Sequence, residues 1–363
     1  MKALIISTDE GHALFVLECL AASKVKIYVM GLNNMLRIRL SRYCNGYLTY
    51  KLSDLLEVND NIIDDINGYC KKEKIDTVMS AGMDATLFIS KIKERIVTAN
   101  VFPVSDLETL NMLNNKWKFS EFMTENDIAY PKTILVTDMS QLKSQDLDFP
   151  LMIKPLELDA NRGVAKLNSF KELETYILHK DEFNKLPLLI QEYIPGYDAG
   201  ISIMAKNGKV IAWTIQKWHT DRRIIEFIKD DNILNIGKKI ASCCNYNGVA
   251  HIDMMLDNRD KSVKVLECNP RFWGSIVFSM WCGVNFPYIG MLIARGDTIS
   301  KDMSYKEIMY IPSRRFIPGI LVDKSLRDIN KYDFYLINRL AADPLVYICM
   351  AVIGLASRFK KIS

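Results

Sequence analysis

The sequence lacks the cysteine patterns and the long apolar runs that would assign it to several large protein classes. Its eight cysteines include no C-x-x-C pair, and their spacing matches neither a zinc site nor a disulfide framework. Several lie in apolar runs, where a free cysteine behaves as a small hydrophobe, so a reduced, cytoplasmic compartment is expected. No stretch reaches the roughly 20 apolar residues that span a bilayer, and the apolar run in residues 1–7 is too short for a signal peptide.

The sequence also has no marked excess of one charge, no internal repeats and no low-complexity segments. Lys and Arg total 47 against 43 Asp and Glu, so the formal charge is +4, which argues against nucleic acid as the main partner. The composition is that of an ordinary globular protein, 49% hydrophobic and 25% charged. Because 363 residues are too many for one core, two or three domains are expected.

The first hundred residues alternate between short apolar strands and helical patterns. Strands are expected at 2–7, 25–30 and 75–79, and helices at 11–23 and 53–72. This alternation is typical of βαβ units with a parallel sheet, in which ligands bind beyond the carboxyl ends of the strands. The loops 7–12 and 80–84 follow such strands, although helix caps and turns require the same polar residues.

A domain boundary is expected near Pro103, where this alternation ends. Residues 111–125 then favour an amphipathic helix that carries Lys116. Further on, the apolar strand 149–155 contains Lys154. A lysine in such a strand is costly to bury without a charge partner, although on an edge strand it could extend to water.

The segment Gln191–Asp198 follows an apolar strand and turns at Pro195-Gly196 before an acidic residue. Exposed backbone groups at such a turn can read the edge of an adenine ring, and a carboxylate can accept hydrogen bonds from ribose hydroxyls. An ordinary strand exit explains the same pattern when the segment is taken alone.

Two β-hairpins are predicted in the following segment, and the second gathers oxygen ligands. Apolar runs flank Asn207-Gly208, a strong hairpin signal, and another pair flanks the loop 258–262. Glu267 and Asn269 are two apart on a strand and share a face, and one of a few registers puts Asp253 opposite Glu267. Two carboxylates on a mostly apolar hairpin are hard to explain without a cation. With an amide oxygen, they suit magnesium that holds a polyphosphate.

Together these pieces resemble the ATP-grasp fold of carboxylate–amine ligases. That family includes D-alanine–D-alanine ligase, biotin carboxylase and the carbamoyl phosphate synthetase large chain. Each motif is moderately specific, but the ordered set is highly specific. The set comprises Lys116, Ile-Lys-Pro at 153–155, Gln-Glu-Tyr-Ile-Pro-Gly at 191–196, Ile-Asp-Met-Met at 252–255 and Glu-Cys-Asn-Pro-Arg at 267–271.

The resemblance implies an α/β protein whose ATP-grasp part is α+β. An N-terminal parallel-sheet domain of the type that precedes the ATP-grasp fold would occupy 1–105. The ATP-grasp domain would occupy 106–297, with subdomains at about 106–190 and 191–297. Residues 298–363 would form a C-terminal extension.

The resemblance also implies the cofactors ATP and magnesium, with manganese as an alternative, and a role for each motif residue. The implied nucleotide contacts are Lys116, Lys154 and, as a weaker candidate, Lys217 for the phosphates, Gln191, Glu192 and Ile194 around the adenine hinge, Asp198 for the ribose, and Met255 and Leu266 for packing against the base. The implied metal ligands are Asp253, Glu267 and Asn269, and the implied catalytic residues are Arg271 and Lys154. Arg271 would stabilise negative charge on an acyl phosphate or its tetrahedral successor.

The implied reaction activates a carboxylate as an acyl phosphate, joins it to an amine, and releases ADP and phosphate. The expected partners are small-molecule carboxylate and amine substrates, with a homodimer as the default assembly. Two alternatives stay open: an ATP-grasp enzyme with a non-amine acceptor, carboxylating or kinase-like, and a degenerate nucleotide-binding scaffold without turnover.

The sequence departs from the family pattern at two places. The loop after Lys154 contains one glycine, Gly163, where relatives have several, and Arg162 is a candidate to compensate for the lost backbone contacts to phosphate. His251 stands where dipeptide-forming relatives have an arginine, which argues against a dipeptide ligase.

The C-terminal tail has an apolar run with basic residues after it. Residues 345–356 are apolar, and Arg358, Lys360 and Lys361 follow. The run is too short to span a membrane. A peripheral helix at the membrane interface and a terminal helix packed on protein or on a second copy both fit this pattern.

Overall fold

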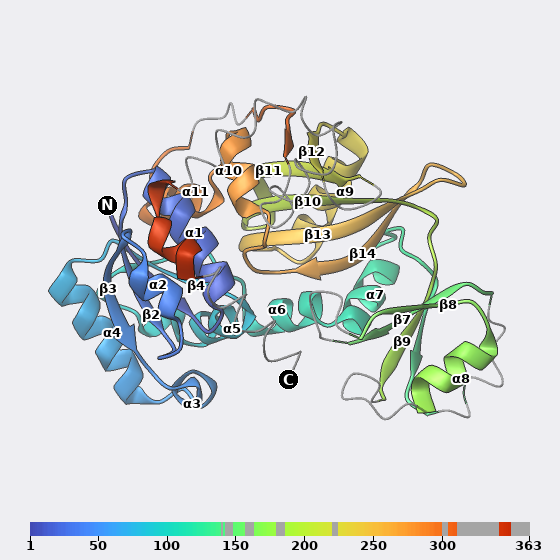
Figure 1. Ribbon diagram of the computed structural model, residues 1–363, viewed down its shortest axis with the longest axis horizontal. Helices are drawn as coiled ribbons and strands as arrows, with labels where there is room; N and C mark the ends of the chain where they lie inside the picture. Colours follow the sequence, from blue (N-terminus) through green and yellow to red (C-terminus); the bar gives the residue numbers. More distant parts are fainter. Residues whose placement is uncertain are drawn as a thin grey trace.

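The computed structural model describes residues 1–138, 141, 148–156, 163–178, 186–219, 224–299, 304–310 and 341–349. Within these residues the chain forms three β-sheets with helices around them, as Figure 1 shows. The mixed α/β architecture and the N-terminal parallel sheet are as predicted.

The first sheet is parallel and has the strand order β3-β2-β1-β4-β5. Its strands are β1 Lys2–Ser7, β2 Lys26–Gly31, β3 Cys44–Thr49, β4 Thr77–Ala81 and β5 Asn100–Val101. The surrounding helices are α1 Glu10–Ala22, α2 Leu36–Leu40, α3 Leu52–Leu56, α4 Asp60–Glu73, α5 Met83–Ile92 and the 3-10 helix Lys93–Arg95. The three predicted strands are confirmed, whereas β3 has a mostly half-buried pattern that gives little sequence signal.

Two helices predicted as continuous are each broken at an asparagine. The segment 53–72 divides into α3 and α4, and the side chain of Asn59 accepts a hydrogen bond from Ile62 N at 3.0 Å. The segment 111–125 divides into α6 Leu107–Asn114 and α7 Lys116–Glu125, with the side chain of Asn115 as the N-cap of α7. Asparagine favours a cap over a helix interior because its side chain competes for backbone hydrogen bonds.

The strand order reverses between β1 and β4, and this reversal places two loops together. Ser7 and Ala81 are paired at the carboxyl ends of these strands, and the Ser7 hydroxyl donates to the Ala81 carbonyl at 2.6 Å. The turns that follow, and the first residues of α1 and α5, therefore lie at the point of the sheet where ligands bind in open α/β folds.

The second sheet is antiparallel and has the order β6-β9-β7-β8. Its strands are β6 Thr133–Val136, β7 Leu151–Pro155, β8 Ala165–Leu167 and β9 Leu188–Glu192. One face packs on α8 Phe170–Leu178 through Ile153, Ile190 and Leu173. Because side chains alternate along a strand, Lys154 and Gln191 extend from the other face.

The third sheet is antiparallel, with the order β14-β13-β10-β11-β12-β15. Its strands are β10 Gly196–Lys206, β11 Lys209–Trp218, β12 Ile225–Ile228, β13 Gly248–Asp257, β14 Val263–Asn269 and β15 Met309–Tyr310. Both predicted hairpins are confirmed, and Asn207 and Gly208 have the positive φ angles, 50° and 72°, of a tight hairpin turn. Strand β15 lies beyond residue 297, so this sheet includes part of the predicted C-terminal extension.

Helix α9, Asp231–Cys243, covers one face of the third sheet. Ile201 of β10 and Ile215 of β11 share a hydrophobic cluster with Ile233 and Ile240 of α9. The opposite face of the sheet turns toward the second sheet and the first domain, as Figure 1 shows.

The first domain and the third sheet share one hydrophobic core. Helix α1 packs against α10 Ile276–Cys282 and α11 Phe286–Arg295. A side-chain carbon added at Gly290 of α11 would lie 1.9 Å from the Phe102 ring, so the two parts meet without room for a methyl group.

The terminal described segment, 341–349, packs on the first domain near α2 (Figure 1). Asp343 accepts hydrogen bonds from the Ser41 hydroxyl and, at 3.2 Å, from Arg42 N, and Val346 is buried. This part of the tail is packed on protein, and the rest of it lies outside the described residues.

Within the described ranges, no single helix has the length and apolar composition needed to cross a membrane. Helices α10 and α11 pass that test only as a pair, with a bend of 82° between them.

Candidate active site

The face of the third sheet opposite α9 brings together side chains from three adjacent strands. Asp253 of β13 pairs with Glu267 of β14, so the predicted register is confirmed. Asp253 also pairs with Gly200 of β10, and Asp198 pairs with Met255. Directly paired residues share a face, so Asp198, Met255, Asp253 and Glu267 point the same way.

Asp253, Glu267 and Asn269 form one polar cluster on this face. The Asn269 amide nitrogen donates to Asp253 Oδ2 at 2.9 Å and to Glu267 Oε1 at 3.5 Å. Both acidic side chains are partly open to solvent, with 37% and 27% exposure. Two carboxylates joined through one amide leave oxygen atoms that can face a cation.

The orientation of Asn269 sets what this cluster can bind. Its amide nitrogen faces the carboxylates, while its oxygen accepts from Arg271 Nη2 at 3.2 Å. A rotation of the amide would turn the oxygen toward the carboxylates and complete a set of hard oxygen ligands. No three His, Cys, Asp or Glu side chains among the described residues could together hold a metal ion. A magnesium ion here would therefore depend on Asn269 and on phosphate oxygens.

Two buried lysines approach this cluster from elsewhere in the chain. Lys116, in the first turn of α7, has its Nζ 3.2 Å from Glu267 Oε2. Lys154 of β7 donates to Gln191 Oε1 at 2.7 Å, and Gln191 donates to the Thr133 hydroxyl at 2.9 Å. Each lysine is only 8% exposed. Lys154 is thus a buried lysine in the interior of the sheet and not an edge-strand lysine that extends to water.

Shifts in pKa connect the lysines with the acids across the two sheets. Burial lowers the pKa of Lys154, with Lys116 acting in the same direction, while Glu267, Asp253 and Asp198 oppose the shift. Burial would raise the pKa of Asp253, but His251, Arg271 and Lys154 outweigh it, so the pKa of Asp253 is lowered. The positive and negative groups therefore lie close enough to shift one another's pKa.

Arg271 connects this cluster to the first domain, a contact that the sequence reasoning missed. Its Nη1 lies 2.9 Å from His12 Nε2 and donates to the Phe272 carbonyl at 3.0 Å. His12 Nδ1 lies 3.0 Å from Asp9 Oδ2, although without the alignment of a hydrogen bond. The pKa of Asp9 is lowered, chiefly by His12.

The loop 7–12 was interpreted as a helix cap, and Asp9 does cap α1 by accepting from His12 N at 2.9 Å. The same turn also presents His12 to Arg271. An acid and a histidine three residues apart in a first helical turn were the available signal, but their distant partner could not be read from the sequence.

The segment between the second and third sheets is held by a second arginine that the sequence reasoning also missed. Arg259 Nη2 lies 2.6 Å from Glu192 Oε1 and 2.6 Å from Asp257 Oδ2. Asn258 N donates to the Pro195 carbonyl at 2.8 Å. Ile194 is buried. The Glu192 side chain is thus ion-paired with Arg259. An adenine ring at this segment would therefore be recognised by backbone groups.

His251 stands behind Asp253 in a buried polar network. Its Nδ1 lies 2.8 Å from the Ser202 hydroxyl, its Nε2 lies 3.3 Å from Asp253 Oδ1, and its ring stacks on Trp273 with centroids 5.6 Å apart. These contacts orient the Asp253 carboxylate.

Two predicted nucleotide contacts take different positions. Lys217 pairs with Ala199, and its Nζ stacks 4.8 Å from the centre of the Tyr197 ring, on the α9 side of the sheet, so the structure does not bring it to the cluster. Leu266 is half-buried beside a register shift in β14 and has no direct partner in β13. Arg162, the candidate for phosphate contact, lies outside the described residues.

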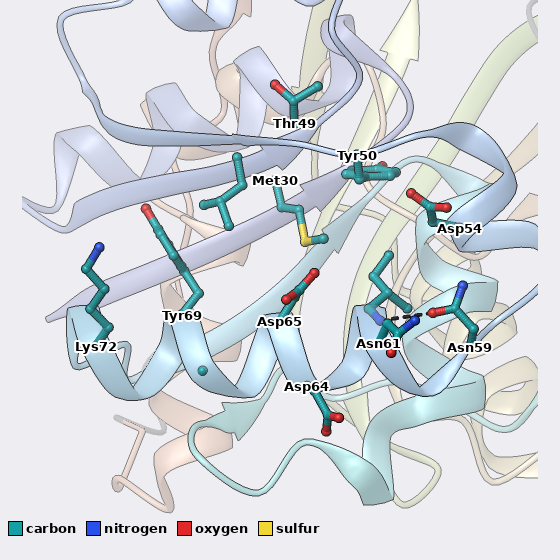
Figure 2. Close-up of a pocket in the computed structure, with 13 residues that line it drawn as sticks. Met30, Thr49, Tyr50, Asp54, Asn59, Asn61, Asp64, Asp65, Tyr69 and Lys72 are labelled. Carbon is teal, nitrogen blue, oxygen red and sulfur yellow. Dashed lines mark hydrogen bonds between the residues drawn. The ribbon is translucent and has the colours of Figure 1, made fainter.

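A cavity of about 590 Å³ lies elsewhere, in the first domain between β3, α3 and α4 (Figure 2). Tyr50, Asp54, Asp65 and Tyr69 line it. None of the predicted site residues lines this cavity.

Several known proteins are similar to this chain in sequence. A family model described as "ATP-grasp in the biosynthetic pathway with Ter operon" matches residues 184–311. The carbamoyl phosphate synthase large chain of Thermoanaerobacter sp. (strain X514) is 25% identical over 218 residues, which are 55% of this chain and 20% of that protein. The D-aspartate ligase of Enterococcus faecium is 24% identical over 251 residues, 60% of this chain and 58% of that ligase. This chain thus spans about a fifth of one relative and under two thirds of the other.

Solved structures share the fold at lower sequence identity. The L-amino acid ligase from Bacillus licheniformis superposes with a TM-score of 0.62 at 18% identity, covering 84% of this chain and 77% of that one. The ADP complex of an N5-carboxyaminoimidazole ribonucleotide synthetase gives 0.68 at 15% identity, covering 91% and 85%. The chain belongs to the ATP-grasp superfamily. The family-matched span of this ATP-grasp protein contains the carboxylate cluster, Asp198 and Arg271, whereas Lys116 and Lys154 precede it.

Proposed function

We propose that this ATP-grasp protein is an ATP-dependent ligase that activates a small-molecule carboxylate as an acyl phosphate and joins it to an amine. The observation that carries the proposal is the meeting of Lys116, Lys154 and Arg271 with the Asp253–Glu267 pair between two sheets. Three cations facing two carboxylates leave an excess of positive charge for an anion such as a polyphosphate, and the carboxylates can then hold a metal ion that the anion brings.

The donor set fits magnesium-ATP. Asp253, Glu267 and a rotated Asn269 amide would hold the metal ion, which would supply positive charge to the phosphates. Lys116 and Lys154 would contact phosphate oxygens from the opposite side. Asp198 and Met255, paired on the same face, would receive the ribose and the base. Manganese would suit the same oxygen ligands.

The chemistry requires two anions to approach each other. A carboxylate oxygen of the substrate attacks the γ-phosphorus, the bond to the β-phosphate oxygen breaks, and ADP leaves. The amine then attacks the acyl carbon and phosphate leaves. Lys154 and Lys116 would offset the charge of the first step, and Arg271 that of the tetrahedral species in the second.

Arg271 also indicates where the substrates lie. It reaches His12 in the loop after β1, at the reversal point of the parallel sheet. The carboxylate and the amine would therefore enter between the first domain and β14. The names of two relatives, D-aspartate ligase and L-amino acid ligase, support an amine as the acceptor.

The test is a screen of carboxylate and amine libraries for release of ADP and phosphate with magnesium-ATP. Carboxylates labelled with heavy oxygen should pass one labelled oxygen to the released phosphate. Lys154→Met should abolish turnover, whereas Lys238→Met, an exposed lysine on α9, should not. Release of AMP, or phosphate without label, would exclude the acyl phosphate route. Label transfer without any amine requirement would favour a non-amine acceptor.

A further inference from the structure

An exposed apolar surface lies where the C-terminal segment packs beside α2. Leu36 and Leu40, one helical turn apart in α2, are 49% and 37% exposed. Leu345 and Ile348 of the terminal segment are 54% and 58% exposed. The hydrogen bonds of Asp343 to residues 41 and 42 hold the two segments together. These four side chains are here named the α2–terminal face.

Arginines flank the α2–terminal face, and one of them, Arg37 of α2, is paired with Glu10. Arg39 and Arg42 are exposed beside it and contact Asn33, Tyr47 and Tyr43. Among the described residues, neither arginine has a carboxylate at ion-pair distance. Asp343, the one acid in 341–349, is buried and accepts two hydrogen bonds. The face therefore offers apolar surface and positive charge together.

The sequence after the described segment has the same character. Residues 344–363 contain no Asp or Glu, and Arg358, Lys360 and Lys361 lie in this stretch. An apolar surface with basic residues and no acids is typical of proteins that lie on the polar boundary of a membrane.

We infer that the α2–terminal face docks on an anionic lipid surface, with Leu36, Leu40, Leu345 and Ile348 in the headgroup region. A second copy of the chain is a poorer occupant, because a twofold contact would set Arg39 and Arg42 against their own copies. Anionic headgroups complement these arginines, and each cation near such a surface strengthens binding about fivefold.

The experiment is co-sedimentation of the full chain with vesicles of phosphatidylglycerol and phosphatidylcholine, against phosphatidylcholine alone. We expect binding to the anionic vesicles only, weakened by high salt. The double change Arg39→Gln with Arg42→Gln should weaken binding about 25-fold, since two cations are lost. Leu345→Ser with Ile348→Ser should remove binding. Leu178→Ser, at a still more exposed apolar position on α8 (71%), should leave it unchanged.

Two results would overturn the inference. One is a full chain that ignores anionic vesicles, or that binds them equally well with both double changes. The other is a dimer in analytical ultracentrifugation that the same changes dissociate while the vesicles are ignored. The unfolding temperature of each variant shows whether it is folded. ADP release in solution, measured in parallel, keeps this test separate from that of the proposed reaction.

Discussion

Glu267→Gln changes the proposed metal site by one charge and almost no volume. Glu267 Oε2 lies 3.2 Å from Lys116 Nζ and the side chain is 27% exposed, so its environment is intermediate between water and the protein interior. A hydrogen bond that involves a charged group contributes about 1.5–3 kcal/mol. With a loss of about 2.7 kcal/mol, the affinity for magnesium-ATP should fall about 100-fold.

The assay is thermal or urea unfolding with and without magnesium-ATP. At a concentration 100 times the wild-type dissociation constant, the nucleotide stabilises the wild type by about 2.7 kcal/mol. A 100-fold weaker variant at the same concentration would gain only about 0.4 kcal/mol. Turnover should fall by at least the same factor, because a weakened metal site also loses charge stabilisation in the transition state.

Glu226→Gln is the matched control for this change. Glu226, in β12 of the same sheet, has the same 27% exposure, and its Oε2 lies 3.1 Å from His219 Nε2. It should keep the full stabilisation by nucleotide. If Glu267→Gln also keeps it, the cluster is not the metal site and the reasoning from its geometry fails.

Three further predictions concern Asp198, His12 and the pair Asp257–Arg259. Asp198→Ala should raise the KM for ATP and leave kcat largely unchanged, because ribose contacts are alike in the ground and transition states; an equal fall in kcat and kcat/KM would contradict this. His12→Ala should lower kcat about 10-fold or more without changing magnesium-ATP affinity. His12→Gln, whose amide oxygen can still accept from Arg271, should recover part of that loss; equal losses would indicate that the contact positions nothing. Hydrogen bonds from Arg259 lower the pKa of Asp257 to about 2, below the value of about 3.9 expected in the unfolded chain. This pair therefore stabilises the fold above about pH 4, and that stability is lost as the pH falls toward 2. Urea unfolding of Asp257→Asn should lack that part of the acid dependence.

Local patterns in the sequence predicted part of each sheet, including both hairpins, and the pairing of the proposed metal ligands. Apolar runs around turn residues fix a hairpin register within one or two choices, so the pairing of Asp253 with Glu267 could be predicted from local sequence alone. What could not be predicted depends on distant residues. No local pattern places His12 beside Arg271 or Arg259 beside Glu192.

Lys217 shows how one residue changes a prediction. A regular hairpin extended from Asn207-Gly208 would set Lys217 opposite Asp198. A register shift between Met204 and Ala205 moves the pairing by one, so Lys217 lies opposite Ala199 instead. Because side chains alternate, that single shift turns Lys217 to the α9 face. Turn residues alone did not reveal the shift. The cytoplasmic location and the homodimer stay predictions.

The absence of free space between Gly290 and Phe102 has a consequence for protein engineering. Chimeric enzymes are commonly attempted by exchanging a domain at its linker, which here would be a cut near Pro103. Such an exchange would leave α1, α10 and α11 without matching surfaces, because their side chains belong to one core. A recombinant that carries a relative's first domain should fold only if α10 and α11 come from that same relative. The unit of exchange in this protein is therefore discontinuous in sequence, and a library built on contiguous blocks would discard most of its members as aggregates.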